Sequence, residues 1–105
     1  MTQACLVFTS LPDEASAFAV SEALIERRLA VCVSRLPGIS STYRWEGKIE
    51  RAEEVALIIK TTQEQYPALE KAIIDLHPYD LPEILAVPVS QALPAYLTWM
   101  GTETV

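Results

Sequence analysis

The order of extended and helical segments constrains the fold of this chain more than any other feature of its sequence. Apolar residues repeat at spacings of three and four from Ala17 to Leu29 and from Tyr66 to Leu76, which predicts two amphipathic helices. Extended and largely apolar segments precede, separate and follow them, at residues 4–10, 31–62 and 83–90. This order predicts an α+β fold of the βαββαβ kind, a four-stranded antiparallel sheet with both helices on one face.

Local signals indicate where the elements begin and end. Asp13 is in position to cap the first helix, which we expect to run to about Ala30. The spacing of Thr62 and Gln65 resembles a capping box for the second helix, and His77 ends it because a proline follows. A last short helix is expected between Pro94 and a closing Gly101.

Residues 31–62 read as one long hairpin. Glu46-Gly47 predicts a two-residue turn, since glycine accepts a positive φ, and Pro37-Gly38 predicts a bend in the first limb. Pro88 indicates that the last strand lies at an edge of the sheet. Two helices cannot cover a sheet with so long a hairpin, so we expect its aromatic tip around Trp45 to dock on a second copy of the chain. The alternative is that the hairpin folds back on its own sheet.

Length and charge restrict the classes of function. The chain has 105 residues, enough for a single domain spanning 1–105, and a formal net charge of −6. An acidic surface repels phosphates, and the expected central strands carry only Phe8 for base stacking, so we expect no nucleic-acid partner. No apolar run approaches the ~18 residues of a membrane span. The N-terminal sequence does not resemble a signal peptide, and Cys5 and Cys32 read as reduced thiols, which predicts a cytoplasmic protein.

Few residues offer chemistry. The sequence has one histidine and neither a nucleophile-elbow nor a phosphate-loop motif, so we expect a binding protein and not an enzyme. His77 and Glu83 flank the HPYDLP turn and form a candidate pair of metal ligands. Alternatively, His77 bonds the last carbonyls of its own helix. Both cysteines are expected to pack in the core as small apolar residues.

Lys60 ends an apolar strand and therefore needs water or a polar partner. One interpretation is an ion pair with Glu50, Glu54 or Glu83. The other is that the lysine contributes to a small polar pocket.

The stretches TSLPDEASA, ERRLAVCVSRLPGISSTYRWEGKIE, EVALIIKTT, LHPYDLPEILAVPV and YLTWM together resemble the CutA family, the divalent-cation tolerance proteins. They follow the family's order and spacing and cover essentially the entire chain. The resemblance implies a ferredoxin-like fold with a long central hairpin and a short C-terminal helix, a homotrimer held by the hairpin and edge strands, and a cytoplasmic location. It also implies binding of divalent metal such as Cu²⁺ and a part in the response to metal ions.

The resemblance also implies a set of site residues near subunit boundaries. His77 and Glu83 are the expected metal ligands, and a possible pocket between subunits is formed by Cys32, Trp45, Glu50, Lys60 and Tyr79. Copper ligands proposed for some members are a cysteine and a second histidine, where this chain has Phe8 and Leu76. We therefore expect copper to be bound weakly or to be shared across subunits, and we expect no organic cofactor.

Two other functions stay open. The fold and trimer also resemble PII signalling proteins, which implies a regulatory module that binds a small anionic metabolite between subunits, with Lys60 and Trp45 lining the pocket. A third interpretation is an assembly protein whose trimer presents surfaces to a partner.

Overall fold

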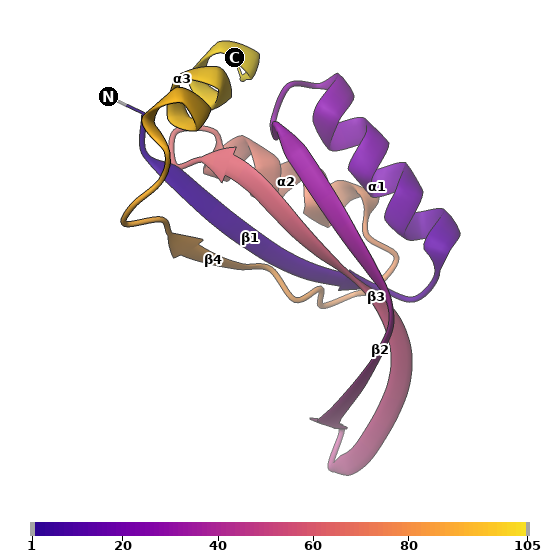
Figure 1. The fold of residues 1–105 in the computed structure, drawn as a ribbon. Coiled ribbons are helices and arrows are strands. Elements are labelled where there is room, and N and C mark those ends of the chain that lie inside the picture. The colour runs from indigo at the N-terminus through magenta and orange to yellow at the C-terminus, as the bar shows by residue number, and fades with distance from the viewer. Residues whose placement is uncertain (1, 105) are drawn as a thin grey trace.

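The computed structural model describes residues 2–104, which fold into one four-stranded sheet with three helices (Figure 1). The elements follow the expected order, and their bounds are β1 (Ala4–Leu11), α1 (Glu14–Glu26), β2 (Cys32–Trp45), β3 (Lys48–Thr62), α2 (Tyr66–Leu76), β4 (Leu85–Pro88) and α3 (Pro94–Glu103). The predicted ferredoxin-like α+β fold is confirmed. None of the helices formed by residues 2–104 combines the length and hydrophobicity needed to cross a membrane.

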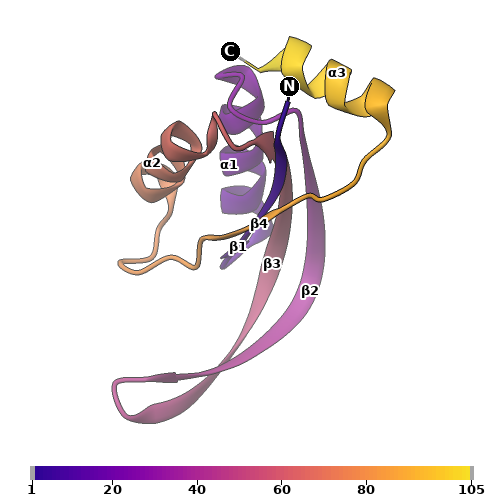
Figure 2. The same ribbon diagram turned by 90° about the vertical axis from the view of Figure 1, so that its left-hand side faces the viewer.

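The strands are arranged in the order β2-β3-β1-β4, and every neighbouring pair is antiparallel. Pro88 lies in β4 at the edge of the sheet, as predicted. At an edge, the N–H that proline lacks is not needed for hydrogen bonds between central strands. The strand is shorter than the expected segment 83–90. Figure 2 shows α1 and α2 together on one side of the sheet.

Strict alternation along the strands divides the sheet into two different faces. The side chains of β1 and β3 that face the helices are fully or almost fully buried and form the core with the inner faces of α1 and α2. These core residues are Val7, Leu11, Ala17, Val20, Leu24, Val55, Leu57, Ile59, Leu69, Ala72 and Ile73. Cys5 is part of this core, as expected, whereas Cys32 is only half-buried.

The hairpin formed by β2 and β3 extends well beyond the helices and gives the molecule its longest dimension, 45 Å against 26 and 23 Å. Its turn is formed by Glu46 and Gly47 with φ values of 49° and 81°, the positive-φ pair of a two-residue hairpin turn. The register shifts between Leu36 and Ile39, where Pro37 and Gly38 oppose the single residue Val55. This β-bulge is the predicted bend, and the limb beyond it curves under the end of β1 toward the loop that joins α2 to β4 (Figure 2).

Two helix ends differ from the sequence expectations. The first helix ends at Glu26 and not near Ala30, because Arg28 adopts a left-handed conformation with φ of 60°. Gly101 does not close the last helix, which continues to Glu103. A side chain at Gly101 would place its Cβ 2.8 Å from the Thr2 hydroxyl oxygen, so this glycine permits close packing of the helix on the N-terminal segment.

Candidate functional site

The loop after α2 is fixed to the sheet by His77, whose side chain is buried with an exposed fraction of 7%. Its Nε2 lies 2.7 Å from the Ser10 carbonyl oxygen, and its Nδ1 accepts a hydrogen bond of 3.1 Å from the Tyr79 backbone N–H. Because the carbonyl can only accept and the amide can only donate, Nε2 must carry the proton. The side chain therefore ties β1 to the loop, and it does not bond carbonyls of its own helix as the alternative interpretation expected.

Tyr79 continues this connection toward β3. Its ring packs against His77 with 4.8 Å between ring centroids, and its hydroxyl donates a 2.7 Å hydrogen bond to the Glu54 carboxylate. Burial, together with this hydrogen bond and the negative charge of Glu54, raises the pKa of Tyr79 above its usual range, so the phenol stays a proton donor at neutral pH. His77, Tyr79 and Glu54 thus form one chain of contacts from β1 to the hairpin.

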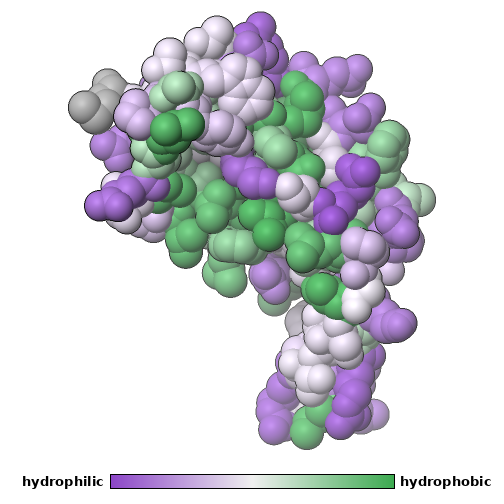
Figure 3. All heavy atoms as spheres, viewed as in Figure 1, coloured by the Kyte–Doolittle hydropathy of each residue, from purple (hydrophilic) through white to green (hydrophobic). Residues whose placement is uncertain are grey.

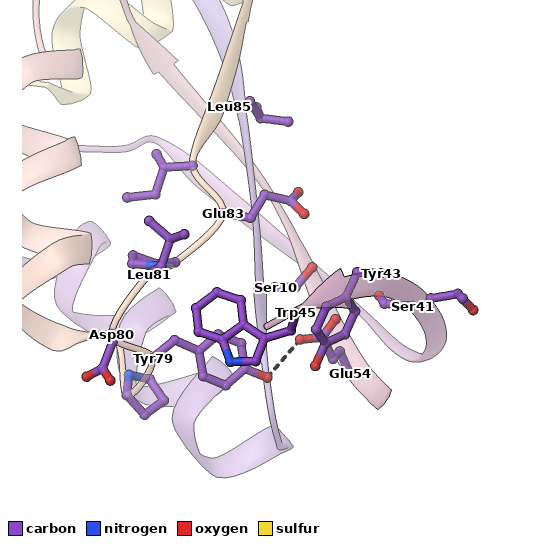
Figure 4. Close-up of a pocket in the computed structure, with 14 residues that line it drawn as sticks. Ser10, Ser41, Tyr43, Trp45, Glu54, Tyr79, Asp80, Leu81, Glu83 and Leu85 are labelled. Atoms are coloured by element: carbon purple, nitrogen blue, oxygen red, sulfur yellow. Dashed lines mark hydrogen bonds between the residues drawn. The ribbon is translucent and has the colours of Figure 1, made fainter. Parts of the chain in front are cut away.

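The loop and the curved hairpin enclose a hollow of about 970 Å³ beneath the end of β1. Tyr43 and Trp45, two residues apart on one face of β2, point into it, and Tyr79 lines it from the loop (Figure 4). The ionisable groups of its wall, besides the tyrosines, are all carboxylic acids, namely Glu54, Asp80 and Glu83. Of residues 2–104, no lysine, arginine or histidine lines the hollow, so its lining combines aromatic and aliphatic side chains with negative charge.

Lys60 and Cys32 lie together at the other end of the hairpin, directly opposite one another in the β2–β3 ladder. The Lys60 ammonium donates a hydrogen bond to the Ser34 hydroxyl, and the Cys32 Sγ lies 3.8 Å from Nζ. Within the described chain, the lysine has no carboxylate in ion-pair distance, so the interpretation as an ion pair with Glu50, Glu54 or Glu83 is wrong within this chain. Glu54 bonds Tyr79 instead.

The candidate pocket residues therefore separate into two groups. Trp45 and Tyr79 line the hollow, whereas Cys32 and Lys60 do not. Trp45 pairs with Lys48, twelve residues before Lys60, which corresponds to about 40 Å of strand. Glu50 pairs with Tyr43 in the hairpin but does not line the hollow either.

A comparison with known families covers nearly all of these residues. The model of the CutA1 divalent ion tolerance protein family matches residues 5–103. The chain belongs to the CutA family. A curated relative, the divalent-cation tolerance protein CutA of Thermus thermophilus, is 39% identical over 99 residues, which are 94% of this chain and 96% of that protein.

Solved CutA structures have the same fold. The crystal structure of CutA from Xylella fastidiosa has a TM-score of 0.95 and 49% identity, covering 97% of this chain and 98% of that one. A CutA from Archaeoglobus fulgidus, described as a periplasmic divalent cation tolerance protein, has a TM-score of 0.93 and 33% identity, covering 95% of this chain and 97% of that one.

The CutA family name refers to divalent cations, so the described residues were compared with the requirements of a metal site. Residues 2–104 contain no group of three or more His, Cys, Asp and Glu side chains that could hold an ion. Of the expected ligands, Glu83 lines the hollow, but both nitrogens of His77 are already engaged in hydrogen bonds. A metal at His77 would have to displace either the Ser10 carbonyl or the Tyr79 N–H.

Tyr43, Glu54 and Asp80 line the hollow but were not among the site residues predicted from the sequence. From the sequence, Glu54 was interpreted only as a partner of Lys60. It directly precedes the core residue Val55, and a carboxylate that is buried with its neighbour needs a polar partner. Asp80 was not considered, because a carboxylate in a proline-flanked loop is typical of any exposed turn.

Proposed function

We propose that this CutA protein is a homotrimeric, non-enzymatic binding protein that takes part in the response to divalent metal ions such as copper. The observation that carries the proposal is the sheet face opposite the helices, which is apolar and has no covering layer in one subunit. The apolar side chains that are exposed or half-exposed on this open sheet face are Leu6, Phe8, Leu36, Ala56, Ile58, Leu85 and Val87.

Figure 3 shows hydrophobic side chains gathered on the face of the molecule seen in Figure 1. An apolar surface extending over four strands is typical of a protein interface, and burying it against other copies supplies the second layer that the fold lacks. Trp45 at the hairpin tip is 46% exposed but lies beyond this face, so the proposed interface rests on the open sheet face and does not require Trp45. If each copy uses the same surfaces and the rotation between neighbours closes, the assembly is a closed ring.

Matched substitutions test the assembly. Ile58→Asp introduces a charge on the open sheet face, whereas Ile74→Asp introduces the same charge at an exposed site on α2. We expect sedimentation to give three times 11.6 kDa for the wild type and for Ile74→Asp, and a smaller species for Ile58→Asp. A wild-type monomer at micromolar concentration would refute the trimer.

The metal part of the proposal relies on ligands from more than one subunit, because a single subunit lacks a complete set. Glu83 is the exposed candidate ligand, and His77 can take part only when metal displaces one of its two hydrogen bonds. The net charge of −6 favours cations in general. Binding that needs such an exchange is expected to be weak.

Copper titration by calorimetry tests this part, using protein without a histidine tag. We expect Glu83→Ala to weaken Cu²⁺ binding and Glu53→Ala, which removes an equal charge from a position that does not line the hollow, to leave it unchanged. Binding by Glu83→Ala or His77→Ala as tight as that of the wild type would exclude the substituted residue as a ligand.

One observation favours a second candidate function, binding of a small anionic metabolite between subunits. Lys60 carries a charge on the apolar open sheet face, and within one subunit its partners are the Ser34 hydroxyl and the Cys32 Sγ, not a carboxylate. An anion bridging subunits at Lys60 would neutralise this charge. Thermal-shift screening of anionic metabolites checks this, because a stabilisation that persists in Lys60→Ala rejects the lysine as the contact.

We further propose a cytoplasmic location. Cys5 and Cys32 are free thiols, which supports a reducing compartment. One relative is described as periplasmic, so the prediction needs a direct check by cell fractionation. Recovery of the protein in the periplasmic fraction would overturn it.

A further inference from the structure

The hollow between the hairpin and the α2–β4 loop combines aromatic walls with negative charge, and neither the metal nor the anion proposal uses this combination. Aromatic rings attract cations over their faces, and this attraction is strongest for poorly hydrated organic cations. A strongly hydrated divalent ion prefers several oxygen or nitrogen ligands, which this hollow does not assemble in one subunit. The chemistry of the wall therefore favours a different class of cation.

We propose that this hollow binds a small organic cation of the alkylammonium class, with Trp45, Tyr43 and Tyr79 as its aromatic walls and Glu54 as its counter-charge. Trp45 and Tyr43 are each 46% exposed, so their rings are accessible from the hollow. No arginine or lysine within the described chain occupies the hollow to satisfy them.

Glu54 is the best-placed counter-charge, because it is fixed and shielded from water. Its exposed fraction is 9%, and the Tyr79 hydroxyl holds one carboxylate oxygen, Oε2, at 2.7 Å. A charge in such a partly desolvated position interacts more strongly with a cation than does a carboxylate in open solvent. Asp80 and Glu83 add negative potential at the rim, where both side chains are exposed.

Two hydrogen bonds fix the wall of the hollow that lies opposite the hairpin. His77 holds the Tyr79 backbone, and the Tyr79 hydroxyl holds Glu54, so ring and carboxylate are oriented before any ligand arrives. Pre-organisation of this kind lowers the entropic cost of binding. A volume of about 970 Å³ exceeds what a small ammonium ion needs, so a larger alkyl substituent fits too.

The probe is tetramethylammonium chloride, compared with sodium chloride at equal ionic strength and with tert-butanol, a neutral molecule of similar size and shape. The chain has two tryptophans, so the indole N–H signals of Trp45 and Trp99 report the site and a distant position in one NMR spectrum. A Trp99→Phe variant assigns them. Titrations include EDTA, which keeps trace metal from contributing to the shifts.

We expect tetramethylammonium to shift the Trp45 signal in a saturable way, and tert-butanol to bind at least about fivefold more weakly because it lacks the charge. Glu54→Gln should weaken binding by about fivefold or more, whereas Glu53→Gln, the next residue along β3, should not change it. Trp45→Leu at the exposed hairpin tip tests the aromatic wall if Glu54→Gln fails to fold, with the Asp80 amide as the reporter.

Several results would overturn the proposal. They are equal affinities for tetramethylammonium and tert-butanol, equal effects of Glu53→Gln and Glu54→Gln, or an unchanged affinity in Trp45→Leu. A folded oligomer whose Trp45 signal does not respond to tetramethylammonium would overturn it as well. That result would leave the trimer proposal standing, so the two failures are distinguishable.

Discussion

Replacing His77 with alanine tests whether this residue is needed for the fold even without metal. The substitution removes the 2.7 Å bond to the Ser10 carbonyl and the 3.1 Å bond from the Tyr79 N–H. Each bond contributes about 1 kcal/mol net, and polar groups left unsatisfied in a buried position add to the cost, so we expect a loss of about 3 kcal/mol. The side chain is 7% exposed, so water cannot easily replace either partner.

Urea unfolding followed by circular dichroism measures this loss. With a slope of about 2 kcal/mol per molar urea, a loss of about 3 kcal/mol lowers the midpoint by roughly 1.5 M. All variants are compared at one protein concentration because an oligomer's stability depends on it. The experiment is run with EDTA, so the expected loss cannot come from a missing metal.

The conservative variant His77→Gln sharpens the test. Its amide can place an N–H near the position of Nε2 and restore the bond to the Ser10 carbonyl, so we expect it to regain about 1 kcal/mol. If His77→Ala shifts the midpoint by less than about 0.3 M in EDTA and still abolishes copper binding, the reasoning fails. His77 would then be a ligand whose hydrogen bonds contribute little.

Three further predictions concern the rest of the fold. Leu57→Ala in the core should cost about 3 kcal/mol in thermal or urea unfolding, whereas Leu36→Ala, at a residue that is 42% exposed, should cost about 1 kcal/mol or less in a monomeric background. Asp13 caps α1, and the Ser16 N–H holds the pKa of its carboxylate below the usual value of 3.8, so its stabilising effect is present above pH 3.8 and is lost as pH falls through the lowered pKa. Unfolding of an Asp13→Asn variant, measured as pH is lowered, should not show this loss of stability. Burial raises the pKa of Tyr66 to about 12, with help from its hydrogen bond to Glu70, so its contribution is present below pH 10.0 and is lost as pH rises toward 12. Unfolding measured across this alkaline range should show no such loss in Tyr66→Phe.

Local sequence signals were sufficient for the order of elements and for several of their ends. The Glu46-Gly47 turn was predictable because the required positive φ is a property of the turn itself, and Pro88 marked an edge strand because its missing N–H is a local fact. The end of α1 was not predictable in this way. It depends on the left-handed Arg28, whose side chain donates hydrogen bonds to the carbonyls of Thr102 and Glu103 at the far end of the chain.

The candidate site was less predictable because its contacts connect residues distant in the sequence. His77 was identified from its chemistry alone, but its partner Ser10 lies 67 positions earlier, and no local pattern reveals that bond. One of the two interpretations paired Lys60 with a carboxylate, yet Glu54 faces the loop and bonds Tyr79, 25 positions later. Which carboxylate meets which partner is decided by the twist and register of the hairpin.

The β-bulge at Pro37 and Gly38 has a consequence for the character of the hollow. One extra residue in β2 exchanges the sides of all later side chains, so that Ser41, Tyr43 and Trp45 face inward. In a regular strand of the same sequence, Arg44 would take this side, and a guanidinium would stand where the aromatic rings now face Glu54. Deleting Gly38 would leave Ile39 opposite Glu54 and keep the aromatic rings in place, whereas inserting one residue between Ile39 and Ser40 would turn them away and bring Arg44 to their side, with no change to any residue of the site itself.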